Sequence, residues 1–226
     1  MKAVASREER QRLARETTRR AVLDAALELF IADGYAQVSI RNIAVKVEYS
    51  PGAIYSYFSS KDEIFFALAE EGFRLLGARG LTPSATDDPV EALRTAAWRF
   101  YEFSKEQPEY FALVFLDRHV PRIGREYEQF AFMSEMKDRI RAQIGRAVAQ
   151  GTFPPSTQTD VAMRLLFAPV VGIVSWMLSQ RLAPGEDPDA LVRDSIETTL
   201  IGLKAGAPVH ARPASRSGGF GVGKTT

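Results

Sequence analysis

Apolar positions recur with helical spacing along almost the whole chain. From about residue 7 to residue 33 they fall at i, i+3, i+4 and i+7, and Gly34 then stands where glycine commonly follows a helix. Shorter helical patterns follow at about 39–46 and 50–58, and a longer one runs from about 59 to 78. No stretch alternates with a period of two, so strands are not predicted and the expected fold class is all-α.

The second part of the chain continues the helical pattern after a segment at 80–89 that is rich in Pro, Gly and small polar residues. The helices expected there lie near 88–106, 108–118, 122–150, 157–181 and 187–205. We therefore expect an N-terminal module at 1–66 and a larger helical body at 67–206. The Pro, Gly, Ser and Arg content of a tail at 207–226 predicts disorder.

Residues 37–66 have the pattern of a helix-turn-helix. Ile40, Ile43 and Ala44 give the first short helix an apolar side, and a break follows at 47–49. Ser50-Pro51 then starts a second helix, with a capping residue followed by proline at the first helical position. In this motif the first helix supports the second, which enters the major groove of DNA.

Several side chains of the motif suit contact with DNA. Ser39 at a helix start and Arg41 on the polar side of the same helix can donate to phosphate or, for Arg41, to a base edge. Small residues at the start of the second helix leave room for the groove, and tyrosine hydroxyls and a lysine can bind phosphates. The candidate contacts are Ser39, Arg41, Tyr49, Ser50, Gly52, Ala53, Tyr55, Tyr57 and Lys61. For Tyr57 a place in the core is an equal alternative.

Charge and composition permit DNA binding and narrow the alternatives. The net charge is +1, but residues 1–61 hold ten Lys or Arg against seven Asp or Glu. The basic stretch at 7–20 is either an arm along DNA or a solvated extension of the first helix. The lack of cysteine excludes disulfides and thiol chemistry, and two histidines far apart make a metal site unexpected. No cofactor and no enzymatic activity are expected.

No secretory signal is found at the start of the chain. The longest apolar run, at 165–178, is shorter than a membrane span needs and contains Pro169. A soluble cytoplasmic protein without membrane contact is therefore expected.

At residues 20–68 the sequence resembles the TetR family of bacterial transcriptional repressors. The resemblance rests on Ala26, Phe30, Gly34, Tyr35, Ser39, Ile43, Ala44, Ser50, Gly52, Tyr55, Tyr57, Phe58 and Lys61. It implies an all-helical homodimer with an N-terminal three-helix DNA-binding domain and a C-terminal domain for ligand binding and dimerisation. It also implies double-stranded palindromic operator DNA and a small-molecule effector as partners.

One segment departs from the family pattern. Where members usually have Ala-Gly-Val in the turn, this chain has Val47-Glu48-Tyr49. Glycine tolerates a left-handed backbone there, whereas glutamate costs on the order of 1 kcal/mol. Either Glu48 points away from DNA or the turn takes a slightly different path, and the module itself is expected to be intact.

The body is rich in aromatic residues between positions 98 and 115, which are either core or the lining of an apolar effector pocket. The resemblance favours a pocket, whose expected lining residues are Trp98, Tyr101, Tyr110, Phe111, Phe115 and Met133. The helices near 157–181 and 187–205 are the expected homodimer interface, because the first is apolar almost all round. An ordinary core helix of a monomer is the alternative.

The expected function is that of a repressor released from its operator by a small apolar or aromatic effector. A constitutive DNA-binding protein of the same fold is the alternative. The C-terminal residues 218–225 satisfy the phosphate-loop pattern G-x-x-x-x-G-K-[ST], but no helix follows to hold a phosphate, so a nucleotide-binding enzyme is not favoured.

Overall fold

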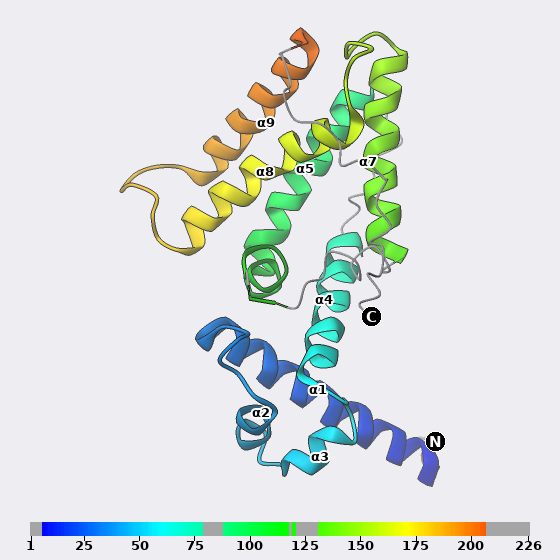
Figure 1. The fold of residues 1–226 in the computed structure, drawn as a ribbon, viewed down its shortest axis with the longest axis vertical. Coiled ribbons are helices and arrows are strands. Elements are labelled where there is room, and N and C mark those ends of the chain that lie inside the picture. The colour runs from blue at the N-terminus through cyan, green and yellow to red at the C-terminus, as the bar shows by residue number, and fades with distance from the viewer. Residues whose placement is uncertain (1–5, 79–87, 118, 121–130, 207–226) are drawn as a thin grey trace, which may run out of the picture.

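The structure is a computed structural model that describes residues 6–78, 88–117, 119–120 and 131–206, without the side chains of residues 131–133. All regular structure in these ranges is helical, which confirms the all-α class (Figure 1). The elements are α1 (Arg7–Asp33), α2 (Ile40–Lys46), α3 (Pro51–Tyr55), α4 (Lys61–Ala78), α5 (Pro89–Glu106), α6 (Pro108–Phe111), the π-helical turn η1 (Ala112–Leu116), α7 (Ala131–Ala149), α8 (Thr159–Leu178) and α9 (Pro188–Ala205).

The N-terminal helices pack around a small apolar centre. Phe30 of α1, Ile43 of α2 and Ile54 of α3 are buried together with Phe58, which follows α3. The half of α1 before Val22 is exposed along most of its length, so the basic stretch at 7–20 is a solvated extension of the first helix. These helices form the lower part of the molecule in Figure 1.

Helix α4 joins this group to the body. It contacts α1 and also α6, η1 and α7, and Figure 1 shows it running from the lower helices to the upper ones. The body consists of α5, α7, α8 and α9, in which α5 and α8 each contact the other three helices. Buried residues of both parts form one continuous apolar cluster, from Val22 to Leu203.

Helix α8 corrects one expectation from the sequence. The run at 165–178 was too short to span a membrane, but the helix that contains it is 20 residues long, and its length and composition would allow it to cross one. A core helix of a soluble protein meets the same criteria. Here α8 packs against α5, α7 and α9 and continues through Pro169, and 33% of its most apolar 18-residue window is buried.

Some predicted segments lie outside the described residues. They include most of the segment at 80–89, the start of the helix predicted at 122–150, and the tail at 207–226 with its phosphate-loop pattern. The side chain of Met133, a predicted pocket residue, also lies outside them.

Candidate functional site

The two helices of the helix-turn-helix, α2 and α3, each begin at a serine that caps the helix. The Ser39 hydroxyl accepts the Asn42 N–H at 3.2 Å, and the Asn42 side-chain oxygen accepts the Ser39 N–H at 2.9 Å. The Ser50 hydroxyl accepts the Ala53 N–H at 3.1 Å, and Pro51 takes the first helical position. Capping satisfies N–H groups that a helix start leaves without a partner, so both helix starts are determined locally.

The turn between α2 and α3 has the left-handed backbone that suits glycine. Glu48 has φ of +58°. Its N–H donates to the Val45 carbonyl at 3.2 Å, and the Tyr49 N–H donates to the Ala44 carbonyl at 2.9 Å. These two bonds form a Schellman motif, in which the residue at the Glu48 position is usually glycine. The prediction that glutamate occupies a glycine-favouring position is confirmed.

A cleft between α2 and α3 brings together three of the predicted DNA contacts. It has a volume of about 410 Å³ and is lined by Ser39, Ile40, Arg41, Pro51 and Tyr55. The Arg41 side chain is exposed, and Tyr55 is 56% exposed. A guanidinium and a phenol hydroxyl at such an edge are donors to phosphate oxygens and, for the guanidinium, to base edges.

The other predicted contacts on this side differ in exposure. Gly52 is exposed and Ala53 is half-buried at the start of α3. Tyr49 is 45% exposed, whereas Tyr57 is half-buried against the core with the Arg15 guanidinium 5.8 Å from its ring centroid. Tyr57 therefore has a packing role within the chain, whereas the Tyr49 hydroxyl lies 3.5 Å from the Thr18 hydroxyl and shares a hydrogen bond with it.

Lys61 has partners within the chain. Its ammonium donates to the Tyr35 carbonyl at 2.7 Å and to the Val38 carbonyl at 2.8 Å, and it lies 4.1 Å from the Tyr35 ring centroid. Burial lowers the pKa of Lys61 below its ordinary value, although the neighbouring Asp62 carboxylate opposes this. Two of its three N–H donors therefore hold the loop between α1 and α2, and only one is left for DNA.

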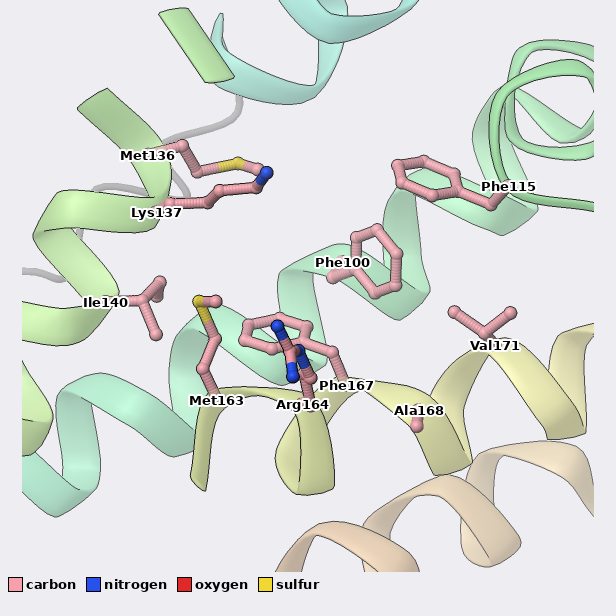
Figure 2. A pocket seen from close by; sticks show the side chains of 10 residues that line it. All are labelled: Phe100, Phe115, Met136, Lys137, Ile140, Met163, Arg164, Phe167, Ala168 and Val171. Atoms are coloured by element: carbon pink, nitrogen blue, oxygen red, sulfur yellow. The ribbon is translucent and has the colours of Figure 1, made fainter. Parts of the chain in front are cut away.

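A separate apolar cavity of about 400 Å³ lies in the body between α5, η1, α7 and α8. Phe100 and Phe115 form one side of it and Phe167 and Val171 another, as Figure 2 shows. The complete lining is Phe100, Phe115, Met136, Lys137, Ile140, Met163, Arg164, Phe167, Ala168 and Val171. Its size and apolar walls are those of a small-molecule site.

The lining differs from the set expected from the sequence, of which it contains Phe115 alone among the residues whose side chains are described. On α5 it is Phe100 that faces the cavity. Trp98 and Tyr101 point elsewhere, because successive helical residues are rotated by about 100°. Tyr110 and Phe111 are buried against other helices. None of these four rings lines this cavity, and Trp98 instead lines a separate cleft between α5 and α9.

Three of the predicted rings that do not line the cavity form hydrogen bonds elsewhere. The Trp98 indole donates to Glu102 at 2.8 Å, and the Tyr101 hydroxyl donates to Asp189 at 2.5 Å. Burial and this hydrogen bond to a carboxylate raise the pKa of Tyr101 above its ordinary value. The Tyr110 hydroxyl accepts from the Arg20 guanidinium at 3.3 Å. These bonds satisfy polar groups of the core, as expected of buried aromatic donors.

Sequence reasoning missed the contribution of α8. Met163, Phe167 and Val171 recur every fourth residue and so form one stripe along the helix that faces the cavity. The stripe is visible in the sequence, but a helix that is apolar on most sides offers no contrast by which to choose it.

Two sets of contacts join the DNA-binding helices to the body. The Tyr35 N–H, in the loop before α2, donates to the Asp117 carboxylate at 3.2 Å, directly after η1. On the other side, Arg20 of α1 donates to Glu71 of α4 at 2.7 Å and also reaches the Tyr110 hydroxyl. Because Phe115 lines the cavity two residues before Asp117, the cavity and the loop before α2 are connected through η1.

The three N-terminal helices, the capped helix-turn-helix and the separate body with its cavity define a helix-turn-helix DNA-binding protein with a ligand-sized site. Residues 22–68 match the family model described as "Bacterial regulatory proteins, tetR family". Residues 22–68 thus form a TetR-family DNA-binding domain, and the curated relatives of the chain are transcriptional regulators.

Curated relatives are transcriptional regulators, and solved structures share the fold. The chain is 24% identical over 190 residues to the transcriptional repressor AcnR of Corynebacterium efficiens, covering 81% of this chain and 92% of that one. It is 31% identical over 111 residues to the transcriptional activator FasR of Mycolicibacterium smegmatis, covering 48% and 50%. Its fold is similar to that of the regulator FadR of Bacillus subtilis, solved in complex with stearoyl-CoA. That match has 17% identity, a TM-score of 0.66, and coverage of 81% and 98%. PfmR of Thermus thermophilus gives 24% identity, a TM-score of 0.64, and coverage of 80% and 98%.

Proposed function

We propose that the chain is a repressor that binds a palindromic operator as a homodimer and leaves it when a small apolar or aromatic molecule fills the cavity. The description of AcnR as a repressor supports the direction of regulation. The stearoyl-CoA bound to FadR of Bacillus subtilis has a long apolar acyl chain, which supports an apolar group as the part of an effector that fills the cavity. A regulator that acts on bacterial DNA works in the cytoplasm, which we propose for this chain.

In this proposal residues 1–66 bind DNA, residues 67–206 bind the effector and the second subunit, and residues 207–226 form a tail. The exposed donors at the cleft between α2 and α3, Arg41 and Tyr55, are the main contacts. Ser39 and Ser50 place helix N-termini toward the phosphates while their hydroxyls cap the helices. Gly52 and Ala53 allow close approach, Tyr49 and Tyr57 add hydroxyl donors, and Lys61 chiefly positions the loop before α2.

The proposed dimer interface lies on α8 and α9. Apolar side chains that the body leaves uncovered are found on both helices, with Trp176 53% and Ile201 64% exposed. Gly172 faces open space, since a Cβ built on it meets nothing within 4 Å, so a partner helix can approach closely there. Contiguous exposed apolar side chains are typical of interfaces, and a two-fold dimer matches a palindromic operator.

The observation that carries the regulatory part is the short route from the cavity to the DNA-binding helices. Phe115 lines the cavity, and Asp117 two residues later accepts the Tyr35 N–H. A ligand that displaces Phe115 shifts η1, and with it the anchor of the loop that precedes α2. A ligand changes an equilibrium only by its difference in affinity for the two states, so occupancy favours the conformation with lower DNA affinity.

The test uses the full chain and an operator selected by it from a library of random duplexes. Fluorescence anisotropy measures operator affinity with and without 1-dodecanol and naphthalene, an aliphatic and an aromatic probe. We expect one or both to weaken binding. Arg41→Ala should weaken it about tenfold or more in the absence of probe, whereas Arg139→Ala, on α7, should leave it unchanged.

A constitutive regulator of the same fold is the alternative, and the cavity argues against it because a filled core would leave no such space. It would be favoured if the probes bound, by calorimetry, without any change in operator affinity.

A further inference from the structure

Helices α1, α4 and α6, each of which contacts the other two, meet at one tyrosine of α6. Tyr110 is 6% exposed, and its ring lies against Gly72 of α4. A Cβ built on this glycine would be 3.1 Å from the Tyr110 Cδ1 and 3.4 Å from its Cβ. Because the ring leaves so little room for a side chain, glycine at this position allows α6 to approach the α4 backbone closely.

The hydroxyl of the same tyrosine reaches the longest of the N-terminal helices. It accepts a hydrogen bond from the Arg20 guanidinium of α1 at 3.3 Å, and Arg20 also donates to Glu71 of α4 at 2.7 Å. A guanidinium presents its N–H donors in a fixed plane, so these bonds restrict the positions of its partners relative to one another. We call these contacts the Tyr110 node, which consists of Arg20, Glu71, Gly72 and Tyr110.

Apolar packing contributes little between α1 and α4 beside the Tyr110 node. A cleft of about 360 Å³ lies there between the two helices, and most of its lining residues are charged, among them Glu16, Arg19, Glu70 and Arg74. Two helices separated by a cleft can change their angle without disrupting a close-packed interface. The hydrogen bonds of Arg20 therefore join α1 to α4 and α6 at a place where packing alone does not determine the angle between them.

We infer that Tyr110 is a positioning residue for operator binding, which sets the orientation of α1, and with it α2 and α3, against the body. This role rests on the proposed function, since the two recognition helices of a dimer need a fixed separation to read a palindrome. It is separate from the Asp117–Tyr35 contact, which anchors the loop before α2. The alternative is that the Tyr110 node only stabilises the fold, so that its loss lowers stability and leaves the choice of operator unchanged.

The spacing of the two half-sites of the operator reports on this orientation. One base pair more or less between them moves one half-site by about 3.4 Å and rotates it by about 35°. We expect the unmodified chain to bind its selected operator at least about tenfold more tightly than either altered duplex. Tyr110→Phe keeps the ring and loses the bond to Arg20, and it should reduce this ratio by about two- to tenfold, the factor that one hydrogen bond contributes to an equilibrium. Gly72→Ala displaces the ring from α4 and should also reduce the ratio.

The body supplies a matched control for each change. Tyr101→Phe also removes the hydroxyl of a buried tyrosine, but the partner of that hydroxyl, Asp189, lies on α9. Gly145→Ala changes a helical glycine of α7 whose Cβ would meet nothing within 4 Å. Both controls should retain the spacing preference, and melting temperatures show which variants remain folded. A loss of folded protein alone lowers affinity for all three duplexes equally and leaves their ratio unchanged.

A second measurement does not depend on DNA. The chain has no cysteine, so Leu13→Cys on α1 and Ala142→Cys on α7, both at exposed positions, can carry spin labels specifically. Excess unlabelled chain ensures that a dimer holds one labelled subunit, and double electron–electron resonance then measures the distance between the two labels. The distance distribution should shift or broaden in Tyr110→Phe and Gly72→Ala and remain unchanged in the two controls.

An unchanged spacing preference in every folded variant of the Tyr110 node would overturn the inference, as would controls that change as much as these variants. If no operator can be selected from random duplexes, the proposed function fails, and an unchanged distance distribution then overturns the positioning role by itself. If the variants of the node lose the spacing preference while an effector releases the operator as before, the positioning role and the proposed function both stand.

Discussion

Glu48 offers a direct way to separate backbone strain from charge at the helix-turn-helix. The residue has φ of +58° in the turn between α2 and α3, is exposed, and has no ion pair among the described residues. Glu48→Gly removes both the left-handed strain and the carboxylate. Glu48→Gln removes the carboxylate and keeps the strain, because glutamine has nearly the same shape.

The expected gain in stability follows from two opposing terms. A non-glycine residue in the left-handed region costs roughly 1–2 kcal/mol, which Glu48→Gly recovers. Glycine also makes the unfolded chain more flexible, which lowers the free energy of unfolding by about 0.4–1 kcal/mol. The net increase in the free energy of unfolding is on the order of 0.5–1 kcal/mol, or about 1–4 °C in melting temperature for a chain of this size. Glu48→Gln should leave stability unchanged.

Operator affinity should respond to the charge instead. The carboxylate lies in the turn next to α3, where DNA phosphates pass in the proposed complex. Its removal should raise affinity by about two- to tenfold at low salt, since exposed unit charges at contact distance interact by about 1 kcal/mol in water. Both Glu48 variants should show this increase, and it should diminish as salt rises.

The chain contains its own control for the backbone term. Gln180 has φ of +55° at the end of α8, and its N–H donates to Met177 in the same kind of helix end. Gln180→Gly should therefore stabilise the chain by a similar amount and leave operator affinity unaltered. Thermal melting and fluorescence anisotropy on the four proteins measure both terms. The reasoning is refuted if Glu48→Gly is no more stable than Glu48→Gln, or if neither variant changes operator affinity.

Three further predictions concern coupling, assembly and pH. Asp117→Asn weakens the anchor of the loop before α2, so an effector that binds normally by calorimetry should release the operator less; unchanged release would exclude this route. Trp176→Asp should yield monomers in light scattering and lose most operator affinity, whereas Leu13→Asp, which changes an exposed leucine far from α8, should remain dimeric. The pKa of Asp189 is lowered, chiefly by the hydrogen bond that its carboxylate accepts from the buried Tyr101 hydroxyl and next by the one from Lys105. Its stabilising effect is complete above the unfolded value of about 3.9 and is lost as pH falls through the folded pKa. Asp189→Asn should thus make unfolding less dependent on pH below about 4 in acid titrations followed by circular dichroism.

Features determined by neighbouring residues could be predicted from the sequence. The serine caps at Ser39 and Ser50 are visible as sequence signals, and the structure forms both. The left-handed turn at Glu48 could likewise be predicted, because a Schellman motif involves six consecutive residues. The all-α class follows from the period of the apolar positions over whole segments.

The cavity lining could not be predicted in the same way. The sequence places an aromatic cluster on α5, but Phe100 faces the cavity while Trp98 and Tyr101 turn toward Glu102 and Asp189. The choice depends on how α5 is rotated against α7, α8 and α9, which come later in the chain. The spacing of apolar residues does not predict which side of α5 faces the cavity, because every side of this helix carries at least one large side chain.

Contacts between the two parts of the molecule were also decided by tertiary structure. Lys61 appeared free to bind phosphate, yet its ammonium holds the Tyr35 and Val38 carbonyls. Asp117 had no assigned role, yet it accepts the Tyr35 N–H across 82 residues of chain. The sequence alone thus determined the class of the protein and the local geometry of its DNA-binding motif. The folded chain decided which rings enclose the cavity and which bonds connect it to that motif, because both depend on how distant helices are oriented against one another.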